Sequence, residues 1–181
     1  MVAVRRRTAE LGKRAVEGSN PSGPILIYKS GEMKKLPWQR NPYLVIDIII
    51  EKNGKIVLIE RNKEPFKNTV SIPGGFVEWG ETVEAAVVRE AKEETSLKVK
   101  PIGIVGVYSN PKRDPRGHLV SIVWAAEVIE GKLKAASDAK DAMWYSLRKI
   151  PFRKIKYDHD AILRDYLKWK KNKGTCWSTK V

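Results

Sequence analysis

The stretch GGFVEWGETVEAAVVREAKEETSL, residues 74–97, joins a glycine turn to a helical pattern that begins near Thr82. With steps of about 100° per residue, Glu90, Glu93 and Glu94 fall on the same side of this helix as its apolar side chains. Carboxylates taken out of water without partners cost several kcal/mol each, so positive charge must meet them. A hard divalent cation suits oxygen ligands, and magnesium is the first candidate.

The alternative for this helix is a solvated end on which Arg89 and Lys92 neutralise the three acids. The preceding glycines argue against that interpretation. Gly74 and Gly75 let the backbone approach a ligand closely, and they place carbonyl and amide groups beside the start of the helix. We therefore favour a cation site at the junction of the glycine turn and the helix.

Outward from this stretch, the pattern predicts a sheet and a second helix. β-branched residues and a Lys-Asn-Gly turn indicate a hairpin of two strands. A strongly polar loop, residues 109–118, separates two later strands, and such a loop seldom serves only as a connection. The expected strands are 43–50, 55–61, 98–108, 119–129 and 141–147, and the expected helices are about 82–96 and 158–170.

Length and composition restrict the class of protein. A chain of 181 residues, 42% hydrophobic, suffices for one domain with a sizeable core. Its formal charge of +14 is concentrated at the two ends, because residues 41–147 hold equal numbers of acidic and basic side chains. The longest apolar run, residues 43–50, is far shorter than a bilayer span, so we expect no membrane partner. The single cysteine, Cys176, indicates a reducing compartment, and we expect a cytoplasmic protein.

The spacing of the acidic helix resembles the signature of a known family. Gly75, five residues, Glu81, seven residues and then REAKEETSL (89–97) resemble the sequence box of the Nudix hydrolases. Ala91 is smaller than the usual aliphatic residue, and Ser96 replaces a glycine at a helix end that favours a left-handed cap. Neither departure removes a metal ligand. The resemblance implies an α/β fold, a Nudix-type α/β/α sandwich with a mixed β-sheet between helices.

The pattern along the chain sets the expected domain boundaries. Residues 36–172 are expected to form the Nudix hydrolase domain, followed by a basic tail, 173–181. Residues 1–35 are expected to be an N-terminal extension that is either disordered or translated from a misassigned start, with Met33 as the true start.

The family cleaves a nucleoside diphosphate joined to another group, and the resemblance implies Mg²⁺ as cofactor, with Mn²⁺ as an alternative. A bound cation neutralises the diphosphate and activates water for attack on phosphorus. For the general base, Glu93 competes with an acid from a later loop, Asp138 or Asp141. By this resemblance the metal ligands are Gly74, Glu90, Glu93 and Glu94, the catalytic residues are Glu93, Glu94 and Asp141, and Glu81 and Arg89 brace the box.

The substrate-binding prediction rests on the polar loop, on the glycine turn, and on the resemblance of residues 61–68 and 108–118 to segments of prokaryotic members of the family. Arg113 and Arg116 offer guanidinium groups to an anionic ligand. Pro111 lies fifteen residues after Ser96, a spacing that resembles the ADP-ribose pyrophosphatase branch of the family. That branch converts ADP-ribose and water into AMP and ribose 5-phosphate. The predicted substrate-binding residues are Arg61, Phe66, Gly74, Gly75, Arg113 and Arg116.

Two alternative functions come from the basic end of the chain. Lys168–Lys173 could touch RNA, which would suit an RNA-end or housecleaning hydrolase acting on oxidised nucleotides or dinucleoside polyphosphates. An ADP-ribose-binding sensor with a DNA-binding appendage is a non-enzyme alternative, but too few residues follow Leu147 for such a domain. We therefore expect a small nucleotide as substrate, no nucleic-acid partner, and a homodimer by the resemblance alone.

Overall fold

The computed structural model describes residues 26–29, 32–35, 41–61, 69–134, 139–155 and 157–177. The chain divides into two units, Met1–Asn41 and Pro42–Val181. In the first unit, β1 (Leu26–Lys29) and β2 (Glu32–Lys35) pair as an antiparallel hairpin, which was not among the strands expected from the sequence. The rest of residues 1–35 lies outside the described residues, and its predicted disorder or misassigned start stays a prediction.

The second unit is built on a mixed β-sheet, as predicted. The spatial order is β10-β7-β8-β3-β4-β5, with β6 beside β3 and β9 beside β4. The pairs β3–β8 and β10–β7 are parallel, and the other pairs are antiparallel. The strands are β3 (Tyr43–Lys52), β4 (Lys55–Arg61), β5 (Val70–Ser71), β6 (Gly74–Phe76), β7 (Lys98–Tyr108), β8 (Leu119–Glu130), β9 (Ala139–Ser146) and β10 (Cys176–Trp177).

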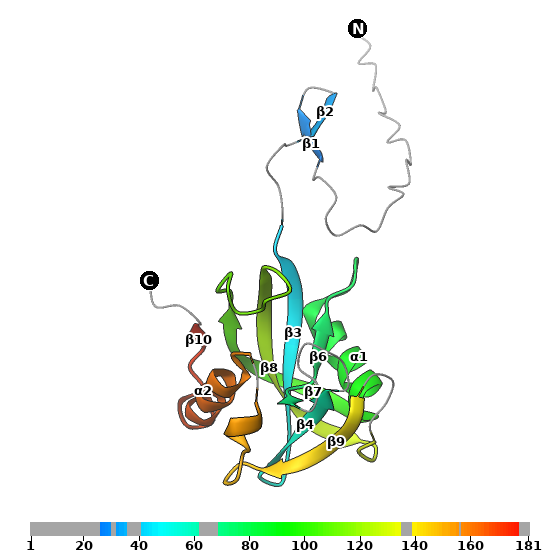
Figure 1. Cartoon of the computed structure of the whole chain (residues 1–181). Coiled ribbons are helices and arrows are strands. Elements are labelled where there is room, and N and C mark those ends of the chain that lie inside the picture. Colours follow the sequence, from blue (N-terminus) through cyan, green and yellow to red (C-terminus); the bar gives the residue numbers. More distant parts are fainter. Residues whose placement is uncertain are drawn as a thin grey trace, which may run out of the picture. The chain divides into compact units, whose positions relative to one another are not determined.

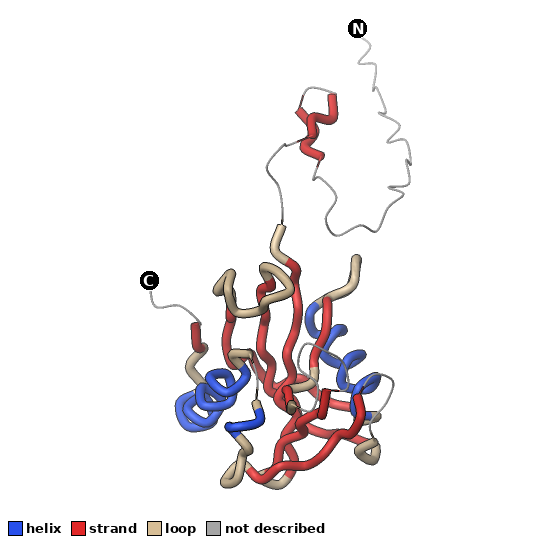
Figure 2. Tube along the Cα trace, viewed as in Figure 1, coloured by secondary structure: helices blue, strands red, loops and turns tan. Residues whose placement is uncertain are grey.

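Two helices cover opposite faces of this sheet (Figures 1 and 2). Side chains alternate between the faces of β3, so Ile46 and Ile48 pack with helix α1 (Val83–Thr95), whereas Ile49 packs with helix α2 (His159–Asn172). A short 3₁₀ helix, Phe152–Lys154, precedes α2. The prediction of an α/β/α sandwich is confirmed, and it places one hydrophobic core on each side of the sheet.

Local sequence signals set the ends of the elements around the site. Asn53 and Gly54 both have left-handed φ values, 51° and 70°, as the tight turn between β3 and β4 requires. The Thr82 hydroxyl accepts a hydrogen bond from the Ala85 backbone N–H and caps the start of α1. Ser96 ends α1 in the left-handed conformation, with φ 60°.

The predicted tail, 173–181, contains a short strand. β10 pairs in parallel with β7 and brings Cys176 opposite Gly106. Residues 178–181 lie outside the described residues. Among the described residues, no helix combines the length and apolar character needed to cross a bilayer.

Candidate active site

The glycine pair of β6 brings this strand into close contact with β3 on one side and with α1 on the other. In the antiparallel register, Gly74 lies opposite Asp47, and Gly75 lies opposite Ile46. A Cβ atom at Gly74 would overlap the carbonyl oxygen of Ile46, and a Cβ atom at Gly75 would overlap the Glu90 carboxylate. Glycine is therefore required at position 74, where the overlap is with backbone atoms, whereas a side chain at position 75 would displace the flexible Glu90 carboxylate.

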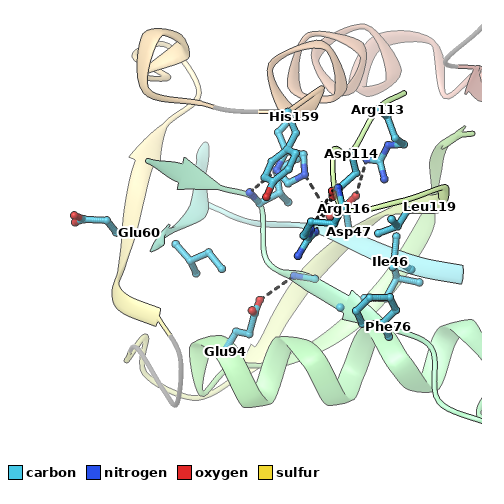
Figure 3. Close-up of a pocket in the computed structure, with 16 residues that line it drawn as sticks. Ile46, Asp47, Glu60, Phe76, Glu94, Arg113, Asp114, Arg116, Leu119 and His159 are labelled. Atoms are coloured by element: carbon cyan, nitrogen blue, oxygen red, sulfur yellow. Dashed lines mark hydrogen bonds and ion pairs between the residues drawn. The ribbon is translucent and has the colours of Figure 1, made fainter. Parts of the chain in front are cut away.

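Two of the three predicted acids of α1 converge on this glycine pair. The Gly74 backbone N–H donates a 2.8 Å hydrogen bond to Glu94 Oε2, drawn in Figure 3. Glu90 is mostly buried, and its carboxylate lies against Gly75. The Glu93 side chain is 57% exposed and faces water. The helix thus presents two sheltered carboxylates and one that remains accessible.

Arg89 ties the helix to the loop that precedes it. Its Nε and Nη2 atoms donate to the two Glu81 carboxylate oxygens at 3.0 and 2.9 Å, and Nη2 also donates to the Phe76 carbonyl at 2.9 Å. Nη1 donates to Glu90 at 2.8 Å. The hydrogen bond to Glu81 raises the pKa of Arg89, and the same bond lowers the pKa of Glu81. The guanidinium group therefore orients the Glu90 carboxylate.

A cavity of about 260 Å³ opens beside the glycine pair (Figure 3). Its lining carries four carboxylates against two guanidinium groups, so its charge is negative when all six are ionised and His159 is neutral. An anionic diphosphate would be repelled there unless a cation accompanied it. The lining residues are Val45, Ile46, Asp47, Ile59, Glu60, Ile72, Gly74, Gly75, Phe76, Glu94, Arg113, Asp114, Arg116, Leu119, Tyr157 and His159.

Asp47 forms the centre of a buried polar network at this cavity. It accepts hydrogen bonds from the Ser121 hydroxyl at 2.6 Å and from Arg113 Nη2 at 3.4 Å. His159 Nε2 lies 3.6 Å from the other Asp47 oxygen. Nδ1 of the same ring accepts the Ile72 backbone N–H at 3.1 Å, which assigns the proton of the neutral ring to Nε2. The network joins β3, β8, the loop 109–118 and the start of α2.

Arg113 connects the loop to α2. Its Nε and Nη2 atoms each donate to an Asp158 carboxylate oxygen at 2.8 Å, and the side chain is only 5% exposed. Burial lowers the pKa of Arg113, but the hydrogen bonds and charges of Asp158 and Asp47 outweigh it, and the pKa is raised. Asp158 precedes α2 and binds Arg113, without a side-chain cap bond to its own helix.

The structure brings some predicted site residues together and separates others. Arg113 and Arg116 line the cavity with Gly74, Gly75 and Glu94. Asp141 is exposed on β9 and does not line the cavity, whereas its cross-strand neighbour Glu60 does. Arg61 ends β4. Phe66 and Asp138 lie outside the described residues, so their predicted roles are untested.

Several cavity residues were not predicted to form the site. Asp47 had a visible signal, because it interrupts the apolar strand YLVIDIII. A carboxylate in a buried strand needs partners, and these are the groups that surround it. Glu60, Asp114 and Tyr157 carried no comparable signal. His159 is a buried, hydrogen-bonded group that also contributes to the cavity wall.

The donor groups at the glycine pair fit a hard divalent cation. Within the described part of the chain, no three His, Cys, Asp or Glu side chains are grouped tightly enough to form a cage. Magnesium does not require such a cage, because it usually binds one or two carboxylates and retains water or substrate phosphate as further ligands. Glu94 supplies a carboxylate at the Gly74 backbone and Glu90 supplies one against Gly75, and the net negative lining suits a cation.

The arrangement is that of a hydrolase built on a glycine turn and an acidic helix, and comparison with known proteins gives its family. The family model described as NUDIX domain matches residues 42–167. The chain belongs to the Nudix hydrolase family.

Among its relatives, an ADP-ribose pyrophosphatase from Methanocaldococcus jannaschii is 51% identical over 144 residues, which cover 80% of this chain and 84% of that protein. The NAD-capped RNA hydrolase NudC of Pseudomonas aeruginosa is 32% identical over 105 residues, covering 58% of this chain but only 36% of that protein. In fold, the chain resembles a Nudix hydrolase from Nitrosomonas europaea, with a TM-score of 0.69, 21% identity and coverage of 85% and 90% of the two chains.

Proposed function

We propose that this protein hydrolyses the diphosphate bond of ADP-ribose, with AMP and ribose 5-phosphate as products, in a reaction that requires Mg²⁺ or Mn²⁺. The observation that carries the proposal is the negatively charged cavity beside the glycine pair and the acidic helix. The choice of ADP-ribose is supported by the similarity to the relative named ADP-ribose pyrophosphatase. Residues 36–172 would form the catalytic domain.

The cation would be held by Glu90 and Glu94, with the Gly74 carbonyl and Glu93 as further ligands. When bound, the cation would neutralise the charge of the diphosphate and lower the pKa of a coordinated water. Arg89 and the Gly74 N–H keep the Glu90 and Glu94 carboxylates in place. Such supporting contacts orient ligands and strengthen metal binding.

Glu93 is the proposed general base. Its carboxylate is accessible to water, and within the described part of the chain one long contact, 3.5 Å to Arg89 Nη1, engages it. In the hydrolysis, a water oxygen forms a bond to phosphorus while the bridging P–O bond breaks. The Glu93 carboxylate receives the water proton, and the bond electrons leave with the departing phosphate oxygen. Neither Glu93 nor Asp141 lines the cavity. Glu93 is favoured because it belongs to the acidic helix whose Glu94 and Glu90 carboxylates lie at the glycine pair, whereas Asp141 lies on β9.

Arg116 is the proposed contact for a substrate phosphate. Its side chain is 48% exposed at the cavity, whereas the Arg113 guanidinium is buried against Asp158. A guanidinium group suits phosphate oxygens because its N–H donors lie in one plane. Arg113 would act mainly by holding the loop 109–118 against α2.

A substrate panel tests this function. Purified protein is assayed with ADP-ribose, an oxidised dGTP, a diadenosine polyphosphate and NAD-capped RNA, each with Mg²⁺ and with excess chelator. We expect the highest kcat/KM on ADP-ribose, no turnover with chelator, and recovery after Mg²⁺ is restored. Fastest turnover of another substrate would overturn the substrate assignment. Binding of ADP-ribose without any hydrolysis would favour a sensor instead.

A further inference from the structure

Asp114 holds Arg116 from one side at the cavity wall. Asp114 is buried, and its carboxylate accepts hydrogen bonds from Arg116 Nε at 3.0 Å, from Nη2 at 2.7 Å and from the Arg116 backbone N–H at 2.8 Å. The hydrogen bond to Asp114 raises the pKa of Arg116. Among the described residues, no hydrogen bond or ion pair involves Nη1. The guanidinium group is thus anchored along one edge, and its Nη1 donors are left for a ligand.

Tyr157 supports the same guanidinium group from a second direction. The Arg116 Cζ atom lies 5.6 Å from the centre of the Tyr157 ring, within the range of a cation–π contact. On the helix side, the ring lies 5.6 Å from the His159 ring at an angle of 38°. Tyr157, His159 and Arg116 all contribute to the cavity wall. Figure 3 labels His159 and Arg116 there.

The backbone of Tyr157 is in an unfavourable conformation for its side chain. Its φ angle is 59°, in the left-handed region, which costs an ordinary residue roughly 1–2 kcal/mol relative to glycine. The following residues maintain it, because Asp158 is bonded twice to Arg113 and His159 is bonded to the Ile72 backbone. Glycine would remove the strain at this position but would also remove the ring. The presence of an aromatic ring at this strained position therefore indicates a role for the ring itself.

We infer that Tyr157 is a positioning residue, which with Asp114 holds Arg116 in the orientation that receives a phosphate of the nucleotide. The inference rests on the proposed function, because it deepens the role of Arg116 there. A flexible arginine must lose side-chain freedom when it binds a phosphate, and this cost weakens binding. Because Arg116 is already held by a carboxylate and an aromatic ring, most of that loss precedes substrate binding. Tyr157 thus acts on substrate affinity through Arg116 and has no step in the chemistry.

A double-mutant cycle tests this role. The variants are Tyr157→Asn, Arg116→Gln, and the two together, because asparagine tolerates a positive φ and should leave the fold intact. The readouts are the AMP dissociation constant from calorimetry, the KM and kcat for ADP-ribose, and the melting temperature. We expect Arg116→Gln to weaken AMP binding and raise KM about tenfold, and Tyr157→Asn about fivefold. The double variant should bind AMP no more weakly than Arg116→Gln does. In all three variants, kcat should change less than KM.

Two further variants separate positioning from stability. Tyr157→Phe keeps the ring and should restore AMP affinity to within about twofold of the wild type. Lys173→Asn changes another residue with positive φ, at the end of α2 and remote from the cavity, and should leave AMP binding unchanged.

Specific results would overturn the inference. The losses of AMP affinity in Tyr157→Asn and Arg116→Gln could multiply in the double variant. That result would mean that Tyr157 does not act through Arg116. Unchanged AMP affinity in either single variant would also overturn it, while leaving ADP-ribose turnover and the proposed function intact. Conversely, an absence of ADP-ribose turnover in the wild type would defeat the proposed function, and the AMP cycle would still decide the role of Tyr157.

Discussion

The backbone N–H of Gly74 donates a 2.8 Å hydrogen bond to the carboxylate of Glu94, twenty residues later in the chain. This contact joins strand β6 to the last turn of α1 and directs one acidic side chain at the cavity. The contact also fixes the position of the helix relative to the glycine turn. A shift of either would move the Glu94 carboxylate relative to the strand backbone.

Replacement of Glu93 by glutamine should remove the general base. We expect kcat to fall at least about 100-fold, since general base catalysis typically contributes 10²–10⁴-fold. The exposed position of Glu93 should leave the fold unchanged. Steady-state kinetics and circular dichroism give the two readouts, and Glu84→Gln in the exposed first turn of α1 is the matched control. Near-normal kcat in Glu93→Gln would exclude it from the mechanism.

Gly75→Ala should displace the Glu90 carboxylate, because the added methyl group would overlap it. A displaced ligand weakens metal binding, and we expect the Mg²⁺ concentration for half-maximal activity to rise about tenfold. The measurement is a Mg²⁺ titration of activity. Gly174→Ala is the control, since a Cβ atom there would have no atom of the described residues, its chain neighbours apart, within 4 Å. Equal Mg²⁺ requirements in both variants would contradict a ligand role for Glu90.

Glu81→Gln should lower stability at neutral pH more than at acid pH. Arg89 lowers the pKa of Glu81 below its ordinary value of 4.5 in the folded protein. A lowered folded pKa stabilises the protein above the unfolded pKa, and this contribution disappears as pH falls through the folded value. Melting temperatures of wild type and variant should therefore differ at pH 7 and converge as the pH falls below 4.5 and through the lowered folded pKa of Glu81. A constant difference across this range would show that the charge of Glu81 is not responsible.

Ser96→Gly should stabilise the protein. Ser96 ends α1 with φ 60° and ψ 14°, a conformation that glycine adopts without a Cβ penalty. We expect the free energy of unfolding to increase by about 1 kcal/mol, measured by chemical denaturation. Ser96→Val is the opposing control, because a β-branched side chain is more strained there and should destabilise. Equal stability of both variants would mean that the cap conformation is not limiting.

The elements around the site were predictable because their signals are local. The helix expected from about Thr82 to Ser96 is observed as Val83–Thr95, and the strands expected at 98–108 and 119–129 are β7 and β8. Hydrophobic period and turn residues depend on backbone geometry over a few positions. The spacing of the acidic residues was sufficient to place the chain in its family.

The cavity was less predictable because distant segments form it. Asp47, Arg113 and His159 meet only after β3, the loop 109–118 and α2 have packed together. Arg113 forms a buried ion pair with Asp158. The local spacing of the sequence does not distinguish such an arginine from one that binds substrate.

Residues 74–97 thus contain enough local information to specify a glycine turn, an acidic helix and the chemistry that these support. Whether a side chain faces the cavity, a partner or water depends on which strands become neighbours, and that is a property of the folded chain. Glu60 and Asp141 illustrate the difference, since they lie side by side on β4 and β9, yet only Glu60 lines the cavity. The reason is physical: periodicity repeats along the backbone, whereas proximity across the sheet arises from topology and packing.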